Sequence, residues 1–115
     1  MIDTIAVHQT DTYPVGPHAP KATATTEGVT EAAVDVWNTD RIDTGIWECT
    51  PGEFLATREG YTEICVILSG RVTLQAEGGE PIEFGPGDVL VTPSGWKGVW
   101  RVHELVRKHY TIIRD

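Results

Sequence analysis

The chain has 115 residues, of which 40% are hydrophobic and 23% are charged, and its formal net charge is −8 at pH 7. This length and balance fit one globular domain. The acidity disfavours nucleic acid and anionic membranes as partners, since both bind basic patches. No segment approaches the roughly 18 consecutive apolar residues of a membrane span. Two cysteines do not form a disulfide framework, so we expect a cytoplasmic protein with reduced thiols.

Residues 1–36 differ in composition from the rest of the chain. Prolines at 14, 17 and 20 and then a Thr/Ala tract occur within HQTDTYPVGPHAPKATATTEG. Such a stretch buries little apolar surface, which predicts an extended N-terminal arm along a barrel edge or across a dimer partner. Within the arm, β-branched residues favour a strand from Ala33 to Trp37 over a short helical turn.

Residues 37–115 have the pattern of an all-β domain. Short runs of alternating or β-branched residues recur about every ten positions, with glycine or proline between them. The expected strands cover 45–50, 61–70, 71–76, 81–84, 88–92, 99–105 and 107–113, with 51–54 as a turn and 55–60 as a strand or loop. This spacing predicts a sandwich or barrel.

Two stretches of this β region resemble the paired motifs of the cupin superfamily. Glu63 precedes Gly70 by seven positions in EICVILSG, and Gly87, Pro93 and Gly95 are spaced as Gly, five residues, Pro, one residue, Gly in GDVLVTPSG. Three longer segments, WECTPGEF, GDVLVTPSGWKGVW and VRKHYTII, are similar to a small single-domain group related to the cupin domain of (S)-ureidoglycine aminohydrolase. The resemblance implies an RmlC-like jelly-roll β-barrel, commonly a homodimer.

The sequence departs from this resemblance at the metal site. Metal-binding cupins carry a His-x-His pair shortly before the glutamate and another histidine after the second motif. Here residues 56–59 read Ala-Thr-Arg-Glu and residues 96–98 read Trp-Lys-Gly. Glu63 alone cannot hold a transition-metal ion, which takes three or four ligands. We therefore expect neither a metal nor another cofactor. The four histidines are placed elsewhere: His8 and His18 in the arm, His103 in a hairpin turn, and His109 on the outer strand face.

Strand alternation indicates which side chains face the barrel interior. If Glu63 points inward, as in the family motif, Cys65 does so too, and Lys108 and Tyr110 share one face of the last strand. An unpaired buried carboxylate is costly, so we expect Lys108 as the ionic partner of Glu63 and Tyr110 as a hydrogen-bond donor. The candidate catalytic residues of the predicted site are Glu63, Lys108 and Tyr110. The candidate ligand-binding residues are Trp47, Cys65, Trp96 and Trp100.

Each of these residues also has a purely structural interpretation. The Glu63–Lys108 pair can be a structural ion pair, the tryptophans can be core or dimer contacts, and Cys65 can be a buried, inert thiol. Three functions therefore stay open. The barrel binds a small polar metabolite and performs acid–base chemistry on it, or it is a non-catalytic binding or structural module. The third is a metal-dependent enzyme of the ureidoglycine aminohydrolase type, which the missing histidines disfavour.

Overall fold

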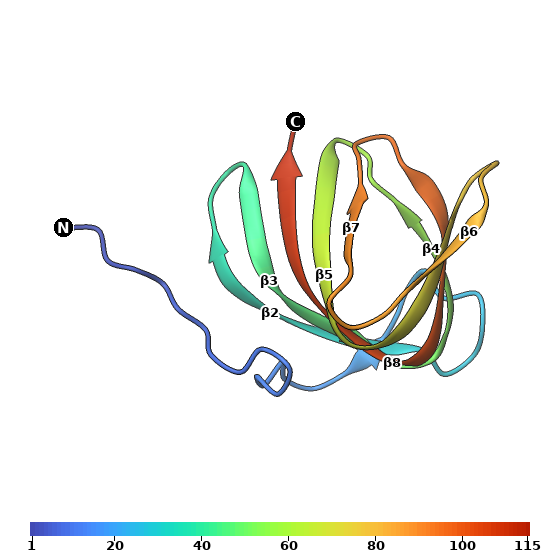
Figure 1. The fold of residues 1–115 in the computed structure, drawn as a ribbon, viewed down its shortest axis with the longest axis horizontal. Helices are drawn as coiled ribbons and strands as arrows, with labels where there is room; N and C mark the ends of the chain where they lie inside the picture. The colour runs from blue at the N-terminus through green and yellow to red at the C-terminus, as the bar shows by residue number, and fades with distance from the viewer.

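The computed structural model describes residues 1–115, and β-strands are its only regular secondary structure (Figure 1). The prediction of an all-β fold is confirmed. The strands are Ala19–Pro20 (β1), Thr30–Asn38 (β2), Ile42–Cys49 (β3), Gly52–Thr57 (β4), Tyr61–Ala76 (β5), Pro81–Phe84 (β6), Val89–Thr92 (β7) and Lys97–Arg114 (β8). The molecule has no helix long and apolar enough to cross a membrane.

Two long strands, β5 and β8, run side by side through both halves of the barrel. Their pairing continues from Tyr61↔Arg114 to Ala76↔Gly98, with register shifts between residues 67 and 72 of β5. One half of the barrel contains β2, β3 and β7 beside the start of β5 and the end of β8. The other half contains β4 and β6 beside the remaining parts of the two long strands. The chain thus curls into a jelly-roll-like barrel (Figure 1).

This continuity corrects two expectations from the sequence. The two strands predicted before and after Gly70 are one strand, and so are the two predicted at the C-terminus. His103 consequently lies within β8, where its Nε2 is 2.7 Å from the Thr73 hydroxyl, and not in a hairpin turn. The expected turn over 51–54 also becomes strand from Gly52 onward. The sequence pattern breaks near Gly70, but the pairing of β5 with β8 continues past this point. The break therefore marks a bend within one strand and not the end of a strand.

Gly70 makes the bend in β5 possible. Its φ is 82°, a conformation that strains any residue with a Cβ. A Cβ at this position would also overlap the carbonyl of Leu105 on β8. The glycine that ends the first cupin-like motif therefore allows two strand backbones to approach closely.

The barrel interior has an aromatic floor, which we define as Trp47, Phe54 and Trp100. The rings of Phe54 and Trp100 stack with centroids 5.6 Å apart, and Trp47 meets both edge-on at 6.0 and 5.9 Å. All three side chains are buried. Aromatic pairs in these geometries contribute about 0.5–1.5 kcal/mol each beyond their buried area. Trp100 Nε1 is nevertheless buried without a hydrogen-bond partner.

Part of the N-terminal arm packs on the outer face of β2 and β3. Val15 is buried there against Ala32 and Ile46, with Val7 and Tyr13 packed beside them. The β2 strand confirms the expected strand at 33–37 and extends it to 30–38, so the predicted boundary after residue 36 falls inside β2. The N-terminal end of the arm extends away from the barrel (Figure 1).

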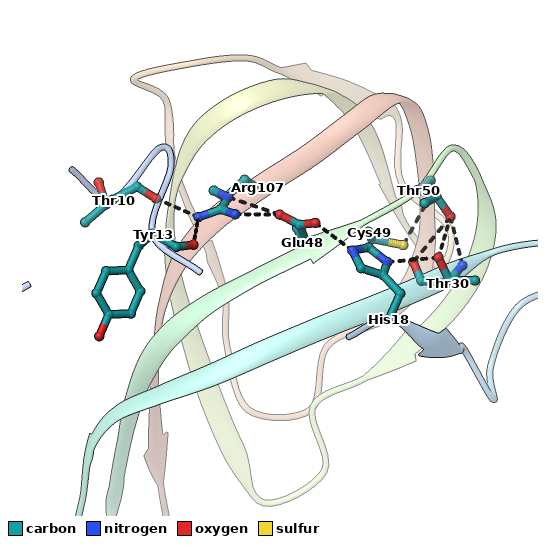
Figure 2. A network of polar contacts seen from close by, with 8 residues as sticks. All are labelled: Thr10, Tyr13, His18, Thr30, Glu48, Cys49, Thr50 and Arg107. Atoms are coloured by element: carbon teal, nitrogen blue, oxygen red, sulfur yellow. Dashed lines mark hydrogen bonds and ion pairs between the residues drawn. The ribbon is translucent and has the colours of Figure 1, made fainter. Parts of the chain in front are cut away.

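A polar network fastens the arm to this outer face (Figure 2). The guanidinium of Arg107 donates to the carbonyls of Thr10 and Tyr13 and to Glu48 Oε1, at 2.7 Å for the shorter bond to the carboxylate. Glu48 Oε2 lies 2.6 Å from His18 Nε2, and His18 Nδ1 is 2.9 Å from the Thr30 hydroxyl. The hydrogen bonds and ion pair therefore fix the arm up to the residue that precedes β1.

Beyond β1, the arm forms a strap, which we define as residues 21–25, across the gap between β2 and β4. The Lys21 N–H donates to the Val29 carbonyl next to β2, the Thr25 N–H donates to Glu53, and the Leu55 N–H donates to Thr23. A single bridge also pairs Ala24 with Phe54. The strap thus makes main-chain contacts with both edges of the open barrel.

Candidate functional site

A cavity of about 510 Å³ lies inside the barrel next to the strap. A volume of this size suits a small molecule. The residues that line it come from the strap, from β2 to β5, from β8, and from the link between β4 and β5: Lys21, Thr23, Ala33, Asp43, Trp47, Phe54, Leu55, Ala56, Thr57, Arg58, Tyr61, Glu63, Lys108, Tyr110 and Ile112.

The centre of the site is the carboxylate of Glu63, which is only 5% exposed. Its Oε1 accepts three hydrogen bonds: from Arg58 Nη2 at 3.0 Å, from Lys108 Nζ at 3.0 Å and from Cys65 Sγ at 3.1 Å. Burial by itself would raise the pKa of Glu63. The charges of Lys108 and Arg58 and the hydrogen bonds outweigh it and lower the pKa to about 2. Glu63 is therefore an anion at any physiological pH.

The pairing of Glu63 with Lys108 agrees with the sequence-based prediction. Lys108 is 5% exposed, and its ammonium group also lies 4.3 Å from the Trp47 ring centroid and 4.4 Å from that of Trp100. Such cation–π contacts are worth about 2 kcal/mol or more when the cation is desolvated. The aromatic floor and the carboxylate together hold the charge of Lys108 in place.

Arg58 was missed as a site residue, although it stands in the segment that replaces the His-x-His pair. It is 8% exposed, and its Nε donates to the Thr92 hydroxyl at 3.0 Å while Nη2 binds Glu63. Its guanidinium lies within 6 Å of the rings of Tyr61 and Trp96. The sequence did carry a signal for it, because a buried glutamate without a metal needs cations nearby. Arg58 and Lys108 supply the positive charge that a metal ion would otherwise bring.

Tyr110 lines the cavity, but the prediction that it donates to Glu63 is wrong. Its hydroxyl donates to Asp35 Oδ1 of β2 at 3.0 Å. The reason lies in the register: Tyr110 pairs with Gly45, and Gly45 pairs with Asp35. A Cβ at Gly45 would lie 2.5 Å from the Tyr110 hydroxyl, so the glycine lets the ring cross β3. Burial and the hydrogen bond to Asp35 raise the pKa of Tyr110 well above its usual range.

The remaining predicted site residues occupy different positions around the cavity. Trp47 lines it, as expected from strand alternation, whereas Cys65, Trp96 and Trp100 are not among the lining residues. Cys65 lies behind Glu63, where burial raises its thiol pKa to about 12. Trp100 is completely buried beneath Lys108, and Trp96 packs beside Arg58. These three residues support the charged side chains from outside the cavity.

Lys21 of the strap is a second cationic residue that the sequence did not single out. Its Nζ lies 2.8 Å from Glu31 Oε1, which also accepts a hydrogen bond from Trp47 Nε1 at 2.9 Å. Burial tends to raise the pKa of Glu31, but these two donors lower it below its usual value. The proline-rich, Thr/Ala-rich composition of the arm gave no reason to place a residue from it inside the barrel.

The donor set around Glu63 does not fit the metal that cupins commonly hold. No group of three His, Cys, Asp or Glu side chains converges anywhere in the structure. The nearest polar atoms to Glu63 belong to Arg58 and Lys108, whose positive charges would repel a divalent ion. His109 lies on the outer face, 2.8 Å from the Thr44 hydroxyl. The polar groups that this site offers a ligand are therefore charged side chains and not a set of metal ligands.

Comparisons with known proteins identify relatives of this arrangement. The family model for the EutQ-like cupin domain matches residues 37–110. The EutQ protein of Clostridium difficile is 20% identical at a TM-score of 0.66, over 75% of this chain and 69% of that one. A protein of unknown function of the DUF861 family from Pseudomonas syringae is 20% identical at a TM-score of 0.72, over 84% of this chain but 42% of that one. A DUF861 family protein from Thermotoga maritima is 38% identical at a TM-score of 0.53, over 56% of this chain and 73% of that one. No curated protein matches the chain. The prediction of a cupin jelly-roll fold is confirmed.

Proposed function

The chain belongs to the EutQ-like cupin domain family, and we propose that its barrel binds a small polar metabolite through an anionic group, without a conventional cupin metal. The observation that carries this proposal is the buried cluster of Arg58, Glu63 and Lys108 at the cavity wall. Two cations share one carboxylate, so the cluster has an excess positive charge in a protein whose net charge is −8. An anionic ligand group would neutralise that excess.

Hydrogen-bonding capacity supports the same conclusion. Lys108 carries three N–H donors and makes one hydrogen bond, to Glu63. Arg58 carries five donors, and its side chain makes three hydrogen bonds, one of them long at 3.4 Å. Donors therefore remain for a carboxylate or similar group in the cavity, where Arg58 offers the planar geometry that binds such groups well.

The pKa values favour binding over acid–base catalysis. A general acid or base works best with a pKa near the working pH. The pKa of Glu63 is lowered to about 2, and that of Tyr110 is raised well above its usual range. Isomerase or aminohydrolase-like turnover of nitrogen-rich metabolites such as ureides, suggested by the sequence resemblance, is the second candidate. It requires a ligand that shifts one of these two pKa values toward neutrality.

A pair of arginine variants tests the binding function. Native mass spectrometry of the purified protein would identify a co-purified ligand, and NMR titration with butyrate would measure the binding of a simple carboxylate. Losing one charged hydrogen bond costs about 1.5–3 kcal/mol, so we expect Arg58→Gln to weaken binding roughly 10- to 150-fold. Arg101→Gln is the control, because Arg101 pairs with Glu53 and does not line the cavity. The proposal fails if neither method detects a ligand in the barrel, or if both variants bind as the wild type does.

A homodimer is the proposed assembly. On the outer face of β5 and β7, Ile64, Val89 and Val91 are 37%, 61% and 51% exposed, next to the area that the arm covers. Contiguous exposed apolar side chains of this kind mark contact surfaces. Light scattering should give twice the chain mass, and a Val89→Lys/Val91→Lys variant should be monomeric. A monomeric mass for the wild type would rule the homodimer out.

A further inference from the structure

We infer that the cavity ligand has two anionic groups, as a short dicarboxylate does, and that Lys21 of the strap binds the second one. This inference rests on the proposed binding function and specifies its ligand class. Lys21, Arg58 and Lys108 all line the same cavity, although Lys21 comes from the strap between β1 and β2.

The ammonium groups of Lys21 and Lys108 lie near the same aromatic floor. Lys21 Nζ is 4.4 Å from the Phe54 ring centroid and 5.8 Å from that of Trp47, while Lys108 Nζ is 4.3 Å from Trp47. Both groups therefore flank Trp47, one toward Phe54 and the other toward Trp100. A flat, short molecule lying along the floor could reach both cations with its two ends.

Lys21 and Lys108 are bound to the wall in the same way. Each makes a single side-chain hydrogen bond to a glutamate, Lys21 to Glu31 and Lys108 to Glu63. Because an ammonium group has three donors, each lysine keeps two for a ligand. Glu31 does not line the cavity, so on that side the ligand would meet the cation and not its counter-ion.

The position of Lys21 is fixed by contacts on both sides of it in the sequence. His18, three residues earlier, is held by Glu48 and Thr30 (Figure 2). On the other side, the strap is hydrogen-bonded to Glu53 and Leu55 of β4. A lysine anchored in this way loses little conformational freedom when it binds a ligand, which favours affinity.

Two acidic residues line the cavity, Glu63 and Asp43; Glu63 is already paired with Arg58 and Lys108, so the acidic group that could compete for a ligand is Asp43. It lines the same cavity and could instead attract an ammonium group, so that the ligand would be a zwitterion. Arg114 already pairs with Asp43, and a second cation there would have to displace it or share the carboxylate. Lys21 and Lys108 each keep free N–H donors, whereas both lining carboxylates already have a cationic partner, so a ligand with two anionic groups is the better match.

Three four-carbon probes distinguish these ligand classes: butyrate, with one carboxylate; succinate, with two; and 4-aminobutyrate, with one carboxylate and one ammonium group. Dissociation constants would be measured by NMR titration of the full chain. We expect succinate to bind at least about tenfold more tightly than butyrate, since a charged hydrogen bond is worth about 1.5–3 kcal/mol. Tighter binding of 4-aminobutyrate than of succinate would overturn the inference in favour of Asp43.

Lysine variants then test the role of Lys21. Lys21→Gln should weaken succinate binding more than butyrate binding and so reduce the preference for succinate over butyrate to about twofold or less, and Lys21→Arg should retain the preference. Lys97→Gln, at an exposed lysine outside the cavity, should leave it intact. A Lys21→Gln protein that keeps the preference would refute the inference. If Lys21→Gln does not fold, Lys21→Arg is the deciding variant. Arginine keeps the positive charge at position 21, so loss of the preference for succinate in Lys21→Arg would also refute the inference.

The same data separate the failure of this inference from the failure of the proposed function. If butyrate binds in an Arg58-dependent manner and succinate binds no better, only the dianion inference is wrong. If no probe binds and no ligand co-purifies, the proposed function itself is wrong.

Discussion

Removing Glu63 should destabilise the protein more than removing Lys108, although both substitutions break the same ion pair. Glu63→Gln would leave two buried cations, Arg58 and Lys108, without a counter-charge. Lys108→Met would leave Arg58 and Glu63 as a neutral pair at 3.0 Å, and the methionine would still pack on the aromatic floor.

The expected magnitudes follow from these remaining charges. Uncompensated buried charge from a broken ion pair costs about 3–5 kcal/mol, so we expect a loss of that size for Glu63→Gln. For Lys108→Met, a charged hydrogen bond of about 1.5–3 kcal/mol is lost, but the desolvation cost of the ammonium group disappears too. We expect a net loss of about 1–2 kcal/mol. Against a total stability of about 5–15 kcal/mol, this difference is readily measurable.

Urea unfolding at pH 7 measures both changes, with the m-value as a check that the unfolded states are comparable. The two variants should differ in melting temperature by several degrees, since 1 kcal/mol shifts a domain of about 100 residues by about 4–8 °C. The reasoning is refuted if Glu63→Gln is as stable as Lys108→Met or more so. That result would mean that other groups already neutralise the excess positive charge of Arg58 and Lys108 in the unliganded protein.

Three further predictions concern pH, thiol reactivity and the bend in β5. The pKa of Glu63 falls from 4.5 to about 2 on folding, so its contribution to stability is complete above about pH 4.5 and is lost as the pH drops toward 2. Urea unfolding at a series of acidic pH values should show a loss of about 3 kcal/mol in the free energy of unfolding, and this loss should be absent in Glu63→Gln. Burial raises the thiol pKa values of Cys49 and Cys65 to about 11 and about 12. Both thiols should therefore resist Ellman's reagent at pH 8 in the native protein and react fully in urea. Rapid labelling of the native protein would contradict their burial. Gly70→Ala should reduce the free energy of unfolding by about 3 kcal/mol or more, because the backbone would be strained and the new Cβ would overlap β8. Gly85 has open space around it, so Gly85→Ala should cost under about 1 kcal/mol. Equal melting temperatures for the two variants would show that the bend in β5 tolerates a Cβ.

Local sequence pattern was sufficient to predict the class of fold and the interior face of the main strands. The spacing of Glu63 and Gly70 marked the cupin-like strand, and alternation placed Glu63, Lys108 and Trp47 in the interior. These features are local, because the direction of a side chain follows from its position in a strand. The need to neutralise a buried carboxylate then identified Lys108 as its partner.

The sequence alone could not reveal contacts that depend on register and on where the arm lies. Tyr110 reaches Asp35 because three strands align across Gly45, and Lys21 enters the cavity because the arm crosses from β2 to β4. Arg58 follows the end of β4, so no strand alternation indicated its direction. The local sequence pattern thus determined which strand residues face the barrel interior, whereas only the tertiary pairing of distant segments decided which charged side chains meet there. The physical reason is that the alignment of neighbouring strands sets the hydrogen-bond partners, and the residue spacing within a single strand does not.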